Sequence, residues 1–184
     1  MLERPIRLDK PLTRLTVMQG QARVSAGPRV EFSTVLGSCV ATCLFDPEIE
    51  LGGMNHFLLA EPPGGSSNVT IDENYGVYLM ELLINEMLAN GAAKSRLRAR
   101  LYGGANMRSG MAQIGTANAE FARRFLHREQ IPLLREDLGG TSARRIEFRP
   151  ASGQVRCRTV AATLLPEPVP IPRSADSGGD VELF

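Results

Sequence analysis

The chain is 184 residues long, with 43% hydrophobic and 22% charged residues, which is ordinary for a globular protein that buries one core. Its 21 basic and 20 acidic side chains give a formal net charge of +1, a balance that argues against nucleic acid or an anionic membrane as the main partner. No apolar run approaches the roughly 20 residues that a membrane-spanning helix needs. Residues 1–7 are too charged for a secretory signal, so we expect a cytoplasmic protein without membrane insertion.

The first third of the chain predicts strands separated by turns. Prolines and charges over residues 1–13 predict a loosely ordered, flexible lead-in. For the strand expected over residues 40–45, the alternative is a short helical turn starting at Ser38, because periodicity does not separate helix from strand over so few residues. Proline, glycine and serine over residues 62–68 predict a loop, which we expect to act as a flap over the site of Cys39 and His56. Strands are expected at residues 15–18, 22–24, 30–36, 40–45 and 51–60.

The remainder of the chain predicts two amphipathic helices and four more strands. The second helix is expected over 117–129, and Arg98 and Arg100 are expected on the solvent face of a strand over 97–102. The composition then changes to proline, serine and glycine, which predicts a flexible tail over 166–184 after a domain over 14–165. The first helix should bury Tyr75, Tyr78, Leu79, Leu82, Leu83 and Met87, and the second Phe121, Ala122, Phe125 and Leu126. The last three strands are expected at 131–136, 143–149 and 154–160.

This order of elements predicts a mixed α/β domain of the α+β type, in which two amphipathic helices cover a sheet.

The three cysteines do not predict a disulfide framework or a metal site. They are Cys39, Cys43 and Cys157, an odd and sparse set. Cys39 and Cys43 form a C-x3-C pair, but no second pair follows, and a closed zinc site needs about four ligands. We therefore expect no metal.

Cys39 and His56 are the predicted catalytic pair, with Cys39 as the nucleophile and His56 as its base. Cys39 follows a Gly37-Ser38 corner, and His56, one of only two histidines, comes 17 residues later. A histidine can take the proton of a thiol and so activate it as a nucleophile. A third group usually orients the imidazole, and the hydroxyls of Ser33 and Thr34 are the candidates.

Backbone N–H groups at the Gly37-Ser38-Cys39 corner are the candidates to stabilise an oxyanion. The alternative for any such cysteine is an inert residue buried in the core, which fits Cys43 and Cys157 better.

Several motifs occur in order over roughly residues 18 to 160. They are Leu36-Gly37-Ser38-Cys39-Val40-Ala41, Asp46-Pro47, Gly52-Gly53-Met54-Asn55-His56-Phe57-Leu58-Leu59, Tyr102-Gly103-Gly104-Ala105-Asn106-Met107, Ile114-Gly115 with Asn118, and Glu136-Asp137-Leu138-Gly139-Gly140 with Arg144 or Arg145. Together these motifs resemble the CheD family of chemoreceptor glutamine deamidases.

The resemblance implies a cysteine hydrolase fold related to toxin deamidases, with layered sheets and helices. It also implies a Cys39–His56 pair assisted by a threonine. The family's threonine falls on Ser33, with Thr34 beside it, so both remain candidates. The implied reaction is hydrolysis of glutamine side chains to glutamate in the cytoplasmic helical region of chemotaxis receptors, through a thioester and without a cofactor.

Three other functions remain open from the sequence. A receptor glutamate methylesterase would use the same acyl chemistry and release methanol. A non-catalytic adaptor would bind receptors and a CheC-type phosphatase, a partner that the resemblance also allows for the enzyme. A general cysteine protease is the least supported, because nothing in the sequence indicates a long substrate cleft.

Overall fold

The computed structural model describes residues 11–61, 70–71, 73–107 and 113–160. Most of the expected lead-in, the expected flap over 62–68 and the expected tail over 166–184 lie outside the described residues. The elements are β1 (Thr13–Thr16), β2 (Gln21–Ser25), β3 (Val30–Leu36), β4 (Val40–Asp46), β5 (Leu51–His56), β6 (Ala60–Glu61), β7 (Thr70–Ile71), α1 (Glu73–Ala89), the 3-10 turn η1 (Lys94–Arg96), β8 (Arg98–Gly103), α2 (Ile114–Arg128), β9 (Leu133–Leu138), β10 (Ala143–Arg149) and β11 (Gln154–Val160).

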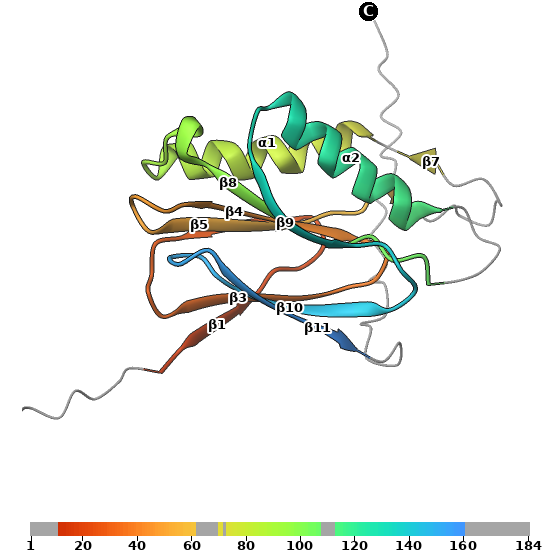
Figure 1. Cartoon of the computed structure of the whole chain (residues 1–184), viewed down its shortest axis with the longest axis horizontal. Coiled ribbons are helices and arrows are strands. Elements are labelled where there is room, and N and C mark those ends of the chain that lie inside the picture. The colour runs from red at the N-terminus through yellow and green to blue at the C-terminus, as the bar shows by residue number, and fades with distance from the viewer. Residues whose placement is uncertain (1–10, 62–69, 72, 108–112, 161–184) are drawn as a thin grey trace, which may run out of the picture.

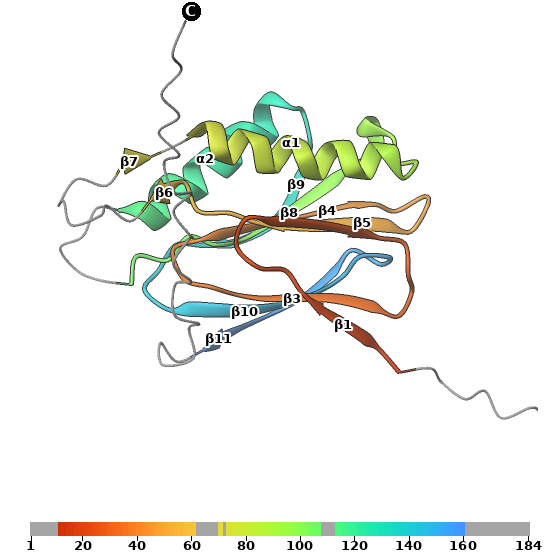
Figure 2. The same cartoon turned by 180° about the vertical axis from the view of Figure 1, so that it is seen from behind.

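Two sheets and a pair of helices form three layers. A five-stranded sheet in the order β2-β5-β4-β8-β9 is the middle layer, and a four-stranded sheet in the order β1-β3-β10-β11 packs on one of its faces. The helices α1 and α2 cover the other face (Figures 1 and 2). This arrangement confirms the predicted α+β class. No helix in the described part of the chain is long and apolar enough to cross a bilayer.

The strand β4 is buried along its whole length because it lies at the centre of the middle layer. Val40 and Leu44 pack in the core under the helices, whereas Ala41 and Cys43 pack in the core between the two sheets. A strand with two buried faces reads as a continuous apolar run, which is the pattern that predicted it. The alternative of a helical turn starting at Ser38 is wrong, because Ser38 lies in a bend before the strand.

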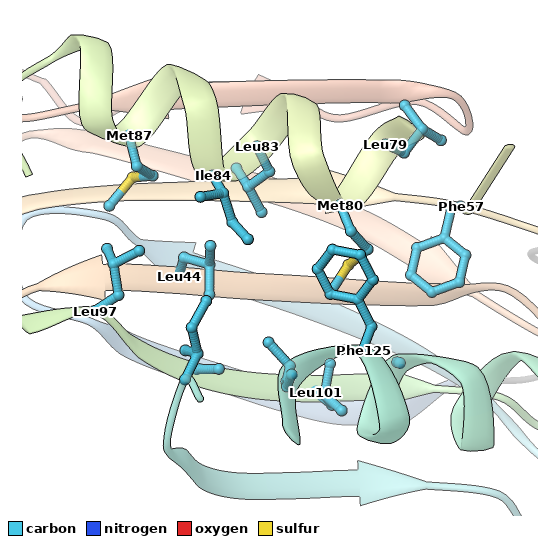
Figure 3. Close-up of a cluster of buried hydrophobic side chains, with 14 of the residues drawn as sticks. Leu44, Phe57, Leu79, Met80, Leu83, Ile84, Met87, Leu97, Leu101 and Phe125 are labelled. Atoms are coloured by element: carbon cyan, nitrogen blue, oxygen red, sulfur yellow. The ribbon is translucent and has the colours of Figure 1, made fainter. Parts of the chain in front are cut away.

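The buried face of α1 differs from the predicted one. Tyr75 and Tyr78 are 37% and 58% exposed, so the prediction that they are buried is wrong. The buried stripe instead includes Gly76, whose missing side chain lets the helix approach Leu59 and Phe121 closely. A glycine is invisible to a search for apolar periodicity, which explains the error. Of the predicted stripe, Leu79, Leu83 and Met87 are buried and Leu82 is only partly buried. Figure 3 shows these three buried residues with Met80 and Ile84, which were not predicted, above Leu44, Leu97 and Leu101.

The arginines of β8 are also less exposed than predicted. Arg98 and Arg100 are half-buried, on the face of β8 that is turned toward the second sheet. The Arg100 guanidinium lies 5.5 Å from the centre of the Phe45 ring, and its Nε donates to the Gly153 carbonyl at 3.0 Å. The face that carries these arginines is therefore only partly open to solvent, because the second sheet covers part of it.

The second helix buries Phe121, Ala122, Phe125 and Leu126 as predicted, but it begins at Ile114 instead of 117. Asn106 explains the earlier start. Its Oδ1 accepts from the Gly115 backbone N–H at 3.0 Å, and its Nδ2 donates to the Thr116 hydroxyl at 2.8 Å. The first turn is thus stabilised by a residue outside the helix.

Candidate active site at the Cys39 corner

The register of β4 and β5 places Cys39 and His56 on the same face of the middle sheet. Val40 and Phe57 exchange backbone hydrogen bonds of 3.0 and 2.9 Å, and Cys43 pairs with Met54. His56 is therefore opposite Ala41, and Cys39 is its diagonal neighbour on the face turned toward the four-stranded sheet.

The imidazole of His56 is held at one nitrogen and free at the other. Its Nδ1 lies 3.0 Å from the Thr34 hydroxyl and 3.3 Å from the Val17 carbonyl. A carbonyl oxygen only accepts, so the contact with Val17 assigns the proton to Nδ1 and leaves Nε2 as the unprotonated nitrogen. Nε2 is buried and has no hydrogen-bond partner among the described residues. The ring therefore presents an unused proton acceptor inside the protein.

Of the two hydroxyl candidates, Thr34 makes the contact with His56 and Ser33 does not. Phe32 and Leu36 pack in the core between the sheets, and Thr34 shares their face of β3 by strand alternation. Ser33 lies on the opposite face, where the residue paired with it on β10 is Glu147.

The backbone corner that carries Cys39 is held in place by hydrogen bonds to its carbonyl groups. The carbonyl of Gly37 accepts from Ala105 N at 2.9 Å, and that of Cys39 accepts from Gly104 N at 2.8 Å. The carbonyl of Ser38 accepts from Asn118 Nδ2 at 2.8 Å. The backbone N–H groups of Gly37 and Ser38 have no backbone acceptor in the described part of the chain, and the Cys39 N–H acts on its own thiol. The Gly37 and Ser38 N–H groups are the ones open to a substrate oxygen in the oxyanion hypothesis.

Sequence reasoning did not assign a role to Asn118 or to Gly103. Asn118 is fully buried in α2, and its Oδ1 also accepts from Leu59 N at 2.9 Å, so it links the ends of the segments that carry Cys39 and His56. Gly103 has a φ of +108°, and a β-carbon there would collide with the Cys39 carbonyl. The sequence feature that could have pointed to these two residues is the cluster of glycine and asparagine in 103–107 together with Asn118.

Burial keeps both reactive groups neutral in the resting protein. It raises the pKa of the Cys39 thiol to about 12, although the residue's own backbone N–H acts to lower it. Burial also lowers the pKa of His56 to about 4, against the effect of the hydrogen bond with Val17. A neutral thiol and a neutral imidazole suit transfer of the thiol proton during attack, with the imidazole acting as a general base.

The other cysteines are placed as core and edge residues. Cys43 is fully buried between the sheets, and burial raises its pKa. Cys157 donates to Asp137 at 3.4 Å. Within the described ranges, no group of three or more histidine, cysteine, aspartate and glutamate side chains could hold a metal ion.

A thiol and a buried imidazole with one free nitrogen, on one face of an α+β sandwich, are typical of the cysteine hydrolases. Comparison with known proteins places the chain within a family. The model for "CheD chemotactic sensory transduction" matches residues 58–159. The chain belongs to the CheD family, which confirms the prediction from the motifs.

The relatives cover almost the whole chain, including Cys39 and His56. The chain is 57% identical to the "Probable chemoreceptor glutamine deamidase CheD" of Zymomonas mobilis over 93% of this chain and 92% of that protein. It is 48% identical to the protein of the same name from Caulobacter vibrioides, with 93% of each chain covered. Among solved structures it is similar to Bacillus licheniformis protein YfiH, with a TM-score of 0.45, 13% identity, and coverage of 65% of this chain and 51% of that chain.

Proposed function

We propose that this protein hydrolyses glutamine side chains of chemotaxis receptors to glutamate and ammonia. The family relationship supports this substrate, because its relatives are named chemoreceptor glutamine deamidases. The observation that carries the chemistry is the His56 ring, whose Nδ1 is held by Thr34 and whose buried Nε2 is unpartnered on the strand face shared with Cys39.

In the first half of the reaction, His56 Nε2 takes the Cys39 proton as the sulfur attacks the carboxamide carbon of the substrate. The N–H groups of the Gly37-Ser38-Cys39 corner donate to the developing oxyanion. His56 then returns the proton to the departing nitrogen, the carbon–nitrogen bond breaks, and ammonia leaves a thioester on Cys39.

In the second half, His56 Nε2 removes a proton from water, which attacks the thioester carbon. The carbon–sulfur bond breaks, glutamate is released and the thiol regains its proton. The sum is one glutamine and one water converted into one glutamate and one ammonia, so no cofactor is required. Thr34 acts as a positioning residue, because it fixes the ring so that Nε2 stays free.

A deamidation assay tests the proposal. The protein is incubated with a purified cytoplasmic fragment of a receptor, and ammonia and intact mass are measured. We expect ammonia release and a gain of about one dalton per converted amide, and both should be lost in Cys39→Ala because the nucleophile is absent.

Cys157→Ala is the matched control and should keep the activity. Equal activity of Cys39→Ala and wild type would refute the mechanism. Release of methanol from a methylated fragment instead of ammonia would identify the methylesterase alternative.

Two finer proposals accompany this function. We infer that the modified glutamines lie in the cytoplasmic helical region of the receptors and that the enzyme acts in the cytoplasm. A CheC-type phosphatase remains a predicted partner, which a pull-down with purified proteins would test.

A further inference from the structure

The turn between β1 and β2 is built into the candidate active site. Gln21 N donates to Met18 O at 3.1 Å, and Gly20 has a φ of +82°, so Gln19 and Gly20 are the central residues of a β-turn. Gly20 N donates to the His56 carbonyl at 2.7 Å. The Val17 carbonyl, just before the turn, faces His56 Nδ1. Two backbone groups, the Gly20 N–H and the Val17 carbonyl, therefore fix the place of this segment beside His56.

The side chain of Gln19 extends from this turn to the sulfur of Cys39. The Cys39 thiol donates to Gln19 Oε1 at 3.4 Å. Gln19 is otherwise exposed, and Cys39 is only partly exposed. An exposed glutamine has no need of this contact to satisfy its amide, which water can also do. Its effect is on the thiol, because it occupies the hydrogen-bonding position beside the sulfur.

We propose that Gln19 is a built-in competitor that occupies the place of the substrate carboxamide at Cys39 until a receptor glutamine displaces it. This inference rests on the proposed function, since the group at the sulfur is chemically the same as the proposed substrate. The contact is non-productive because the carbonyl oxygen, not the carbon, accepts from the thiol. Productive attack would need that oxygen to point away from the sulfur, toward the N–H groups of the Gly37-Ser38-Cys39 corner.

A resident competitor has a defined kinetic consequence. The fraction of enzyme in which Gln19 has moved away sets the apparent affinity for substrate, whereas the bound complex reacts at its own rate. Removing the amide should therefore lower KM for the receptor fragment and leave kcat unchanged. It should also expose the thiol to small reagents, whether or not a receptor is present.

Alkylation of Cys39 by iodoacetamide at constant pH gives the first test. We expect Gln19→Ala to raise the rate about two- to tenfold, which is the range that corresponds to losing one weak hydrogen bond. Gln19→Met, which keeps the length but has no carbonyl, should show how much of the gain comes from the hydrogen bond alone. Gln154→Ala, an exposed glutamine on β11, is the matched control and should react like wild type. Equal rates for Gln19→Ala and wild type would overturn the proposal.

Kinetics and mass spectrometry give the second test. A fall in kcat for Gln19→Ala, with KM unchanged, would overturn the proposal and assign Gln19 to catalysis. The tryptic peptide of residues 15–23 should carry an intact Gln19 amide in the wild-type enzyme, and conversion to glutamate that depends on Cys39 would contradict the non-productive contact. Because alkylation does not require turnover, a lack of receptor deamidation would refute the proposed function and leave the test of Gln19 readable.

Discussion

At the scale of single residues, the two nitrogens of His56 have different surroundings. Nδ1 faces an acceptor and a hydroxyl, and Nε2 faces neither. The Val17 carbonyl determines the tautomer, and the Thr34 hydroxyl restricts the rotation of the ring. A base that is buried, neutral and correctly oriented can take a proton only from a group that is brought to it, which limits the reaction to the thiol and to water in the site.

Replacing Thr34 should affect catalysis more than folding. Thr34→Val keeps the shape but removes the hydrogen bond, which is worth about 1 kcal/mol, so we expect kcat to fall about fivefold. Thr34→Ser keeps the hydroxyl and should restore most of the activity. Ser33→Ala, on the other face of β3, should be close to wild type in the same ammonia assay. Loss of activity in Ser33→Ala, with Thr34→Val unaffected, would reverse the assignment.

At the scale of elements, the residues that follow β8 and the helix α2 hold the Cys39 corner in place. Gly104, Ala105 and Asn118 each donate to one of its carbonyls. Gly103 is the last residue of β8, and its backbone lies so close to the Cys39 carbonyl that no side chain fits. The nucleophile is therefore positioned by a segment that lies more than 60 residues away in the sequence.

Substitutions at two glycines distinguish two effects: the conformational cost of a positive φ and the steric contact with the Cys39 corner. Gly139 has a φ of +80°, and a β-carbon added there would meet no atom within 4 Å, so Gly139→Ala should cost only the conformational penalty of about 1 kcal/mol. Gly103→Ala should lose more stability and also lower kcat, because it pushes the Cys39 corner out of place. Urea unfolding and the ammonia assay measure the two effects. Equal behaviour of the two variants would show that the contact with Cys39 does not matter.

At the scale of the whole molecule, His56 lies at the interface between the two sheets. Its strand is in the middle sheet, and Thr34 is in the four-stranded sheet. Protonation would place a charge in this interface, since the residue is only 6% exposed. The ring that serves as the base therefore also makes the packing of the layers sensitive to acid.

The stability of the protein should fall as the pH drops from about 6.5 to about 4. The pKa of His56 is lowered from 6.5 to about 4, so in this window the unfolded chain binds a proton that the folded chain does not. This difference corresponds to about 3 kcal/mol of unfolding free energy. Urea unfolding at several pH values should show the loss in wild type and in His127→Gln, which changes an exposed residue of α2.

His56→Gln should lack most of that pH dependence. An NMR titration gives an independent check in the wild-type protein, because the His56 ring signal should titrate near pH 4. A His56 signal that titrates near 6.5, with the same pH dependence of stability in both variants, would contradict the assignment.

Local patterns predicted much of this protein. The apolar run of β4, the hairpin of β10 and β11, and the buried face of α2 all depend on periodicity that neighbouring residues reveal. The structure departed from the predictions where a distant contact decided the outcome: Gly76 shifts the buried stripe of α1, Asn106 starts α2 early, and the second sheet partly covers Arg100.

The sequence alone determined the class of fold, the membership of the CheD family and the candidates Cys39 and His56. These follow from residue types and spacings, which can be interpreted from neighbouring residues without knowing the tertiary contacts. Only the tertiary structure showed that Thr34, and not Ser33, contacts His56. It also revealed the Gln19 contact with Cys39 and the hydrogen bond from Asn118 to the Cys39 corner. Those facts depend on which side chains meet across two sheets and a helix, and strand pairing and layer packing decide that across tens of residues.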